Sequence, residues 1–214
     1  MIASIVPIMD AKEWDQDAFR ASIPAARKMV KDAARFCEAG PSLPNWSSQR
    51  PVVELVFYLC KLDYDIKVLL CQLLSDAVNR TVWERHLALE LYEALNTLPT
   101  AINRARVEIA RPGTASSLDL GRFDAASVAY RERVKEIRGD TDFMGGLTLV
   151  RNGVAAHHGL SKGKGMDVSI AWTLNAWKTS QSGVTPFQSQ FTEYAVKLGR
   201  AVQDFGEGIQ GRVA

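Results

Sequence analysis

Apolar side chains recur every three or four residues along most of this chain, which is the spacing of one face of an α-helix. The pattern predicts a first helix from about Asp17 to Glu38, in which Pro24 allows a kink. After a loop over residues 41–49, a long helix is expected to start with Pro51 in its first turn, where the missing N–H costs nothing. Its apolar stripe is Leu55, Leu59, Leu62, Ile66, Leu69 and Leu73.

The second half of the chain shows the same helical spacing of apolar residues. After a turn near Asn79, a long helix carries the stripe Leu87, Leu91, Ala94, Leu98, Ile102, Ala105 and Ile109, and Pro99 should bend or divide it before Pro112-Gly113 ends it. A loop over 116–121 leads to a helix that carries Phe123, Tyr130, Val134 and Ile137 on one side and stops at Gly139. Asp140-Thr141 offers an N-cap for a helix over 142–157, and a last amphipathic helix runs from about Phe187 to Phe205.

One segment leaves two interpretations open. Residues 167–174 alternate apolar and polar side chains, which favours a short strand or hairpin near 166–174, whereas Trp177 lies at helical spacing from Leu174. Because helical spacing covers most of the chain, the fold class expected is all-α. The chain contains no internal repeat. It is a single domain over 1–214 with about five to six helices: an N-terminal helix and loop (1–50), core helices (51–158), and a loop with a C-terminal helix (159–214).

Composition narrows the class of protein. Of the 214 residues, 47% are apolar and 23% charged, as in a globular protein with a real core. Cys37, Cys60 and Cys71 form no CxxC pair, so neither a disulfide framework nor a zinc site is expected, and a reducing, cytoplasmic location fits best. The apolar start, residues 1–9, lacks the basic residues of a signal peptide, and charges interrupt residues 52–78, so no membrane association is expected.

The positive charge is unevenly distributed. The net charge is +2, but residues 104–164 carry 11 basic and seven acidic side chains. Such a bias helps to attract a polyanion, although it is weaker than the basic stripe of a dedicated nucleic-acid binder.

The same region contains the string Leu-Thr-Leu-Val-Arg-Asn-Gly-Val-Ala-Ala-His-His at 147–158, which holds two of the three histidines of the chain. A guanidinium such as that of Arg151 binds phosphate with a planar fork, and an imidazole such as that of His157 or His158 transfers protons near neutral pH. Together they can act on a phosphodiester without a metal or another cofactor.

The string resembles the signature of the HEPN superfamily, in which an Arg and a polar residue precede a His with four to six positions between Arg and His. Arg151, Asn152 and His157 fit that signature. The resemblance implies a helical bundle, commonly dimeric, that often acts as a metal-independent endoribonuclease in toxin–antitoxin or anti-phage modules. It also implies a homodimer with a composite site, an RNA substrate and, as a further partner, an antitoxin or nucleotidyltransferase.

By the same resemblance, His157 would be the general acid or base for attack of the RNA 2′-hydroxyl on phosphorus, Arg151 would hold the phosphate, and Asn152 would orient it. The products would be a 2′,3′-cyclic phosphate and a 5′-hydroxyl. On one helix Arg151 and His157 diverge by about 120°, which a site assembled from two subunits resolves. His158, seven residues from Arg151 and on its face, is the rival acid or base. Glycines 145, 146 and 153 favour close approach of another backbone, from this chain or a second copy.

Other candidates are weaker. Glu90 and Glu93 lie on one helix face, where they could be acids that support the site or, more simply, side chains exposed to solvent. His86 has no other residue at the spacing of a metal ligand. Lys162 and Lys164 lie in the basic loop 159–165 and are candidates to contact an RNA backbone, while Trp172 and Trp177 could stack bases or pack on the bundle. The alternative function is a non-catalytic helical module that binds RNA or another protein, and a helical scaffold without nucleic-acid binding is a third hypothesis.

Overall fold

Six α-helices and one short 3-10 helix make up the part of the chain that the computed structural model describes, residues 16–76, 78–112, 118–151 and 186–210. The helices are α1 (Gln16–Ala39), η1 (Gly40–Ser42), α2 (Trp46–Ser75), α3 (Arg80–Ile109), α4 (Leu120–Gly139), α5 (Thr141–Val150) and α7 (Pro186–Ile209). These elements confirm the all-α bundle expected from the sequence. The strand considered near 166–174 lies outside the described residues.

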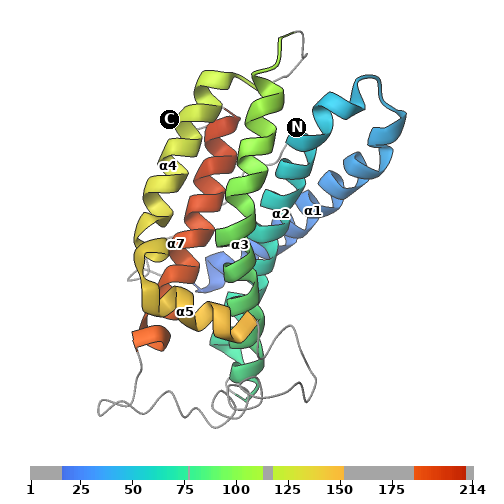
Figure 1. The fold of residues 1–214 in the computed structure, drawn as a ribbon. Coiled ribbons are helices and arrows are strands. Elements are labelled where there is room, and N and C mark those ends of the chain that lie inside the picture. Colours follow the sequence, from blue (N-terminus) through green and yellow to red (C-terminus); the bar gives the residue numbers. More distant parts are fainter. Residues whose placement is uncertain (1–15, 77, 113–117, 152–185, 211–214) are drawn as a thin grey trace, which may run out of the picture.

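The long helices run alternately up and down, and the short α5 turns at the lower end of α4 and crosses the side of α3 (Figure 1). Helix α7 packs on both α4 and α2, α3 packs on α2, and α1 contacts mainly α2. Helix α5 contacts α3, α7 and α4. Helix α5 thereby carries the start of the Arg/His string, residues 147–151, onto the side of α3.

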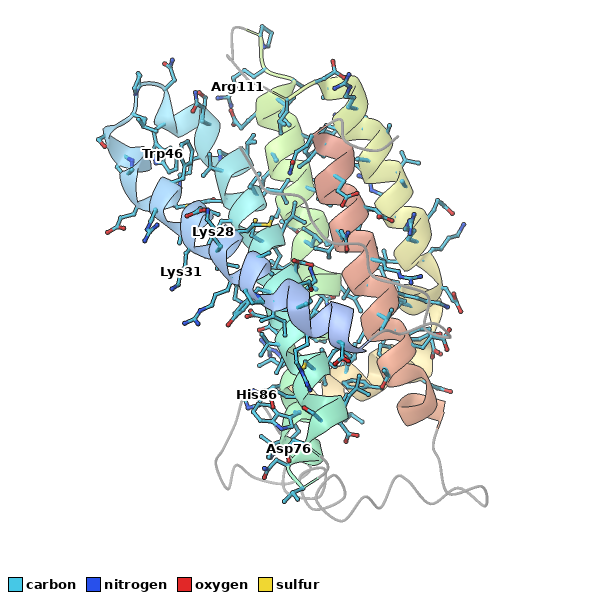
Figure 2. All side chains as sticks on the ribbon, turned by 180° about the vertical axis from the view of Figure 1, so that it is seen from behind. Lys28, Lys31, Trp46, Asp76, His86 and Arg111 are labelled. Carbon is cyan, nitrogen blue, oxygen red and sulfur yellow. The ribbon has the colours of Figure 1, made fainter. Side chains whose placement is uncertain are left out.

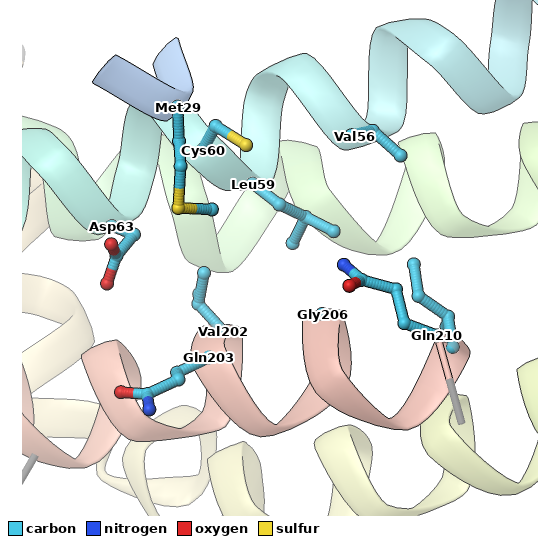
Figure 3. Close-up of a pocket in the computed structure, with 10 residues that line it drawn as sticks. Met29, Val56, Leu59, Cys60, Asp63, Val202, Gln203, Gly206 and Gln210 are labelled. Carbon is cyan, nitrogen blue, oxygen red and sulfur yellow. The ribbon is translucent and has the colours of Figure 1, made fainter. Parts of the chain in front are cut away.

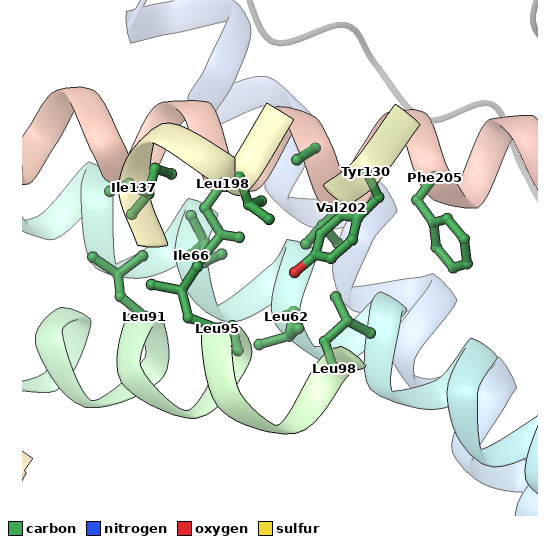
Figure 4. Packing of buried hydrophobic residues seen from close by; sticks show 14 of the residues in the cluster. Leu62, Ile66, Leu91, Leu95, Leu98, Tyr130, Ile137, Leu198, Val202 and Phe205 are labelled. Carbon is green, nitrogen blue, oxygen red and sulfur yellow. The ribbon is translucent and has the colours of Figure 1, made fainter. Parts of the chain in front are cut away.

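The core is one cluster to which α2, α3, α4 and α7 all contribute (Figure 4). It contains the predicted stripe of α3 in full, from Leu87 to Ile109, and the four predicted residues of α4. On α2 the stripe is correct except at one position, since Leu70 is fully buried and Leu69 only partly. The spacing therefore identified the buried faces of α2, α3 and α4.

The start of α2 corrects the sequence analysis. The helix begins at Trp46, within the expected loop 41–49, so Pro51 lies beyond the first turn. The carbonyl of Asn45 accepts hydrogen bonds from Ser48 and Gln49 at 3.1 and 3.2 Å. In addition, the Trp46 ring lies against Gly40, where a Cβ would overlap it. Trp46 lies near the tip of the α1–α2 pair (Figure 2), and its contact with Gly40 across the connection accounts for the earlier helix start.

Other boundaries differ less from the predictions. Pro99 does not divide α3, which continues to Ile109, three residues before Pro112. Helix α4 starts at Leu120 inside the expected loop because the carboxylate of Asp119 caps it, accepting from the backbone N–H of Arg122 at 2.8 Å. Helix α7 runs four residues past the expected end at Phe205.

The hydroxyl of Tyr130 has no hydrogen-bond partner within the described residues, although only 2% of this side chain is exposed. Burial raises its pKa above the ordinary value, so it is neutral. Replacing Tyr130 with Phe removes an unsatisfied polar group, and we expect the free energy of unfolding to rise by about 1 kcal/mol in urea denaturation. Tyr194→Phe is the control, because the Tyr194 hydroxyl donates to Asp140 at 3.1 Å and its loss should lower stability. A lower stability of Tyr130→Phe would contradict the assignment.

Candidate functional site at the end of α5

Helix α5 is fixed at its start by Asp140, as the sequence predicted. One carboxylate oxygen of Asp140 accepts from the backbone N–H of Phe143 at 2.8 Å and caps the helix. The other accepts from the hydroxyl of Tyr194 on α7 at 3.1 Å. One side chain therefore starts α5 and ties it to α7.

Aromatic packing holds the same helix against the bundle. The rings of Phe143 and Tyr194 meet edge to face, with centroids 4.8 Å apart and planes at 87°. Phe143, Leu147 and Val150 are fully buried, so one apolar face of α5 packs into the bundle. The residue that follows, Arg151, is thereby held in a defined place.

Arg151 lies on the side of α3 and is partly open to solvent. Its backbone is still helical, and its N–H donates to the carbonyls of Leu147 and Thr148. Its Nε lies 3.8 Å from Oε1 of Glu93, and its Cζ lies 5.7 Å from the centre of the Tyr92 ring. The side chains of Arg151 and Glu93 are 42% and 43% exposed. The guanidinium is thus positioned by an aromatic ring and a carboxylate while remaining accessible.

Further charged groups lie on the neighbouring surface of α2 and α3. Glu93 accepts from the hydroxyl of Thr97 at 3.4 Å. Lys61 on α2 joins Asp65 at 2.6 Å and Glu90 on α3 at 3.2 Å. Partial burial lowers the pKa of Lys61, but its hydrogen bond to Asp65 and the charge of Glu90 outweigh this and raise that pKa overall. Lys61 is therefore a fixed cation, and each glutamate on this face has a basic partner.

Of the predicted site residues, the structure describes Arg151 alone. Asn152, His157, His158, Lys162 and Lys164 lie outside the described residues, as do Trp172 and Trp177. The motif helix is seen as α5, which starts at Thr141, one residue before the expected start, and its expected end at 157 lies outside the described residues. At Gly145 a Cβ would meet nothing within 4 Å, so no close approach among the described residues explains that glycine.

The structure also adds groups that the sequence did not connect with Arg151. Tyr92 carries no signal of this kind in the sequence. For Glu93 the sequence left open an acid beside the site or a solvated face, and the structure places it beside Arg151. His86 is exposed on α3 near the α2–α3 turn (Figure 2), seven residues before Glu93 and so on the same helix face. Among the described residues, no group of three His, Cys, Asp or Glu side chains could hold a metal ion.

Buried polar side chains also line a small cavity between α1, α2 and α7 (Figure 3). Here a cavity of about 20 Å³ is lined mostly by apolar side chains together with Asp63, Cys60 and Gln203. Asp63 accepts from Lys67 at 2.7 Å, and Oε1 of Gln203 has no hydrogen-bond partner within the described chain. The volume suits a single water molecule. None of the lining residues belongs to the Arg/His motif.

Comparisons with known proteins add no relatives: no family model, no curated protein and no solved structure matches the chain. Within the described ranges, the helices are too short or too polar for any of them to cross a membrane. Assignment to the HEPN superfamily therefore stays a prediction that depends on the motif.

Proposed function

We propose that the chain is a metal-independent endoribonuclease of the HEPN type, with its site at Arg151, Asn152 and His157. The observation that carries the proposal is the placement of Arg151, a half-exposed guanidinium held at the end of α5 by α3. A guanidinium in this state can bind a phosphate oxygen pair without a large rearrangement of the fold.

The proposed reaction needs two functions besides phosphate binding. A base removes the proton of the RNA 2′-hydroxyl as its oxygen attacks phosphorus, and an acid protonates the 5′-oxygen as the P–O5′ bond breaks. His157, with His158 as the rival, supplies proton transfer, and Arg151 stabilises the charge that accumulates on the phosphoryl oxygens. The products are a 2′,3′-cyclic phosphate and a 5′-hydroxyl, and no net oxidation or other reactant is required.

The biological part of the proposal follows from the same resemblance. The protein would act as a cytoplasmic homodimer in which Arg151 and His157 of both copies form one composite site. Its role would be that of a toxin or an anti-phage effector, restrained by an antitoxin or nucleotidyltransferase partner. Lys162 and Lys164 would contact the RNA backbone.

The alternative is a non-catalytic module that binds RNA or another protein. One observation favours the protein-binding form of this alternative: Glu93 already neutralises Arg151, and the two carboxylates of Glu90 and Asp65 outweigh the single charge of Lys61 nearby. Such a surface weakens the attraction for a polyanion. The two functions differ in whether bound RNA is cut.

The test is incubation of the purified chain with a labelled RNA, followed by gel analysis and by binding at several salt concentrations. We expect the wild type to cut RNA, and His157→Ala to remain folded but to lose about 10²–10⁴-fold in rate, since proton transfer contributes that much. If His158→Ala shows the larger loss, the acid or base is reassigned to His158. Salt-dependent binding without cleavage would favour the alternative, and no binding at all would favour a helical scaffold.

A further inference from the structure

Glu93 and a phosphate would compete for the same guanidinium. A carboxylate and a phosphate both present paired oxygens that fit the N–H groups of an arginine side chain. In the structure Oε1 of Glu93 already lies 3.8 Å from Nε of Arg151. An RNA phosphate that approaches this edge of the guanidinium therefore meets a negative charge that is already in place.

The pair between Arg151 and Glu93 is weak enough to be displaced. Both side chains are more than 40% exposed, and exposed ion pairs contribute little to stability because solvent and salt screen them. The Tyr92 ring supports the guanidinium independently, with Cζ 5.7 Å from the ring centre. Arg151 therefore keeps a contact that orients it when the carboxylate is neutralised or moved.

The carboxylate is itself held near the guanidinium. Its second oxygen, Oε2, accepts from the hydroxyl of Thr97 one turn further along α3, at 3.4 Å. Because both residues are on α3, this contact does not depend on α5. Glu93 therefore has a second, weaker contact that does not involve Arg151.

We infer that Glu93 is an autoinhibitory residue that competes with phosphate for Arg151 and so lowers the affinity of the site for RNA. The inference rests on the proposed function. It predicts that neutralising Glu93 strengthens RNA binding, whereas a residue that only positioned Arg151 would weaken binding when it was replaced.

The size of the effect follows from the charges. When a unit charge lies about 6 Å from a phosphate in largely aqueous surroundings, it changes the dissociation constant by a factor of about three to ten. The effect should fall as salt is raised, because solvent-exposed charges are screened over about 10 Å at 0.1 M salt. Glu93→Gln keeps the shape and the hydrogen-bonding capacity of the side chain, so the change isolates the charge.

The experiment measures binding of a fluorescent 2′-deoxy oligonucleotide by anisotropy, because this probe lacks the 2′-hydroxyl and cannot be cut. We expect Glu93→Gln to bind it about three- to tenfold more tightly than wild type at low salt. Glu90→Gln is the matched control: it removes the same charge from the same helix, while its partner Lys61 keeps Asp65. It should change affinity less than about twofold, because the ion-pair partner of Glu90 is Lys61 and not Arg151.

The same assay in an Arg151→Ala background separates this inference from the proposed function. If Arg151→Ala weakens binding and Glu93→Gln then has no effect, competition for the guanidinium is supported. Weaker or unchanged binding by Glu93→Gln alone, or an equal gain from Glu90→Gln, would overturn the inference and leave the proposed function standing. If Arg151→Ala leaves the affinity unchanged, the proposed role of Arg151 fails, whatever Glu93 does.

Discussion

Replacing Arg151 with Ala should lower the rate of RNA cleavage by about 10²–10³-fold, which is the usual cost of removing one group that stabilises transition-state charge. Arg151 is the one predicted site residue whose surroundings the structure defines, at the end of α5 and against Tyr92 and Glu93. Its side chain is partly exposed, so the fold should survive the change. Single-turnover cleavage and the urea unfolding midpoint measure the two effects separately.

The control for this change is another arginine on the surface of the bundle. Arg104 is exposed on α3 and outside the motif, so Arg104→Ala should change the cleavage rate less than about twofold. Arg151→Lys keeps the charge but loses the fork of N–H groups, and it should restore only part of the rate. An Arg151→Ala protein that cleaves at the wild-type rate would exclude Arg151 from the chemistry.

Replacing Lys67 with Met should lower the free energy of unfolding by about 3–5 kcal/mol, the range found when one partner of a buried ion pair is removed. The side chains of Lys67 and Asp63 are 3% and 5% exposed, and Nζ of Lys67 lies 2.6 Å from Oδ1 of Asp63. Burial already raises the pKa of Asp63 although Lys67 opposes that shift. Without Lys67, the carboxylate is left uncompensated in the core.

Two comparisons sharpen this prediction. The double variant Asp63→Leu with Lys67→Met removes both charges and should regain most of the loss. Lys28→Met breaks an ion pair of the same helical spacing with Asp32 on the surface of α1, and it should cost less than about 1 kcal/mol (Figure 2). A loss of similar size in Lys28→Met would show that burial is not the cause.

The buried carboxyl group also determines the direction in which pH changes the free energy of unfolding of Lys67→Met. A carboxyl group whose pKa is higher in the folded than in the unfolded state takes up a proton more readily when folded. The variant should therefore regain stability as the pH is lowered from the folded-state pKa of Asp63 toward the unfolded-state value. Urea unfolding of the variant at neutral and mildly acidic pH measures this gain.

The helices were predictable because each long one buries a single face. The α3 stripe is complete since packing against α2 requires apolar residues at that spacing. The start of α2 was not predictable in the same way. It depends on the Trp46 ring lying against Gly40 at the end of α1, and this contact depends on how the two helices meet.

The candidate site shows the same limit. Arg151 could be identified from its spacing to the histidines, whereas Tyr92 and Glu93 carry no local signal that connects them with an arginine almost 60 residues later. They become neighbours because α5 lies across the side of α3 (Figure 1). Likewise, the charges at Asp63 and Lys67 appeared only as interruptions of an apolar stretch, although they form an ion pair buried on α2.

The most direct test of the account is the chemistry of the RNA ends formed by the wild-type protein in EDTA. We predict that cleavage continues in the chelator and yields a 2′,3′-cyclic phosphate and a 5′-hydroxyl, because the proposed mechanism uses only a guanidinium and an imidazole. Loss of cleavage on chelation, or products with a 3′-hydroxyl and a 5′-phosphate, would contradict it.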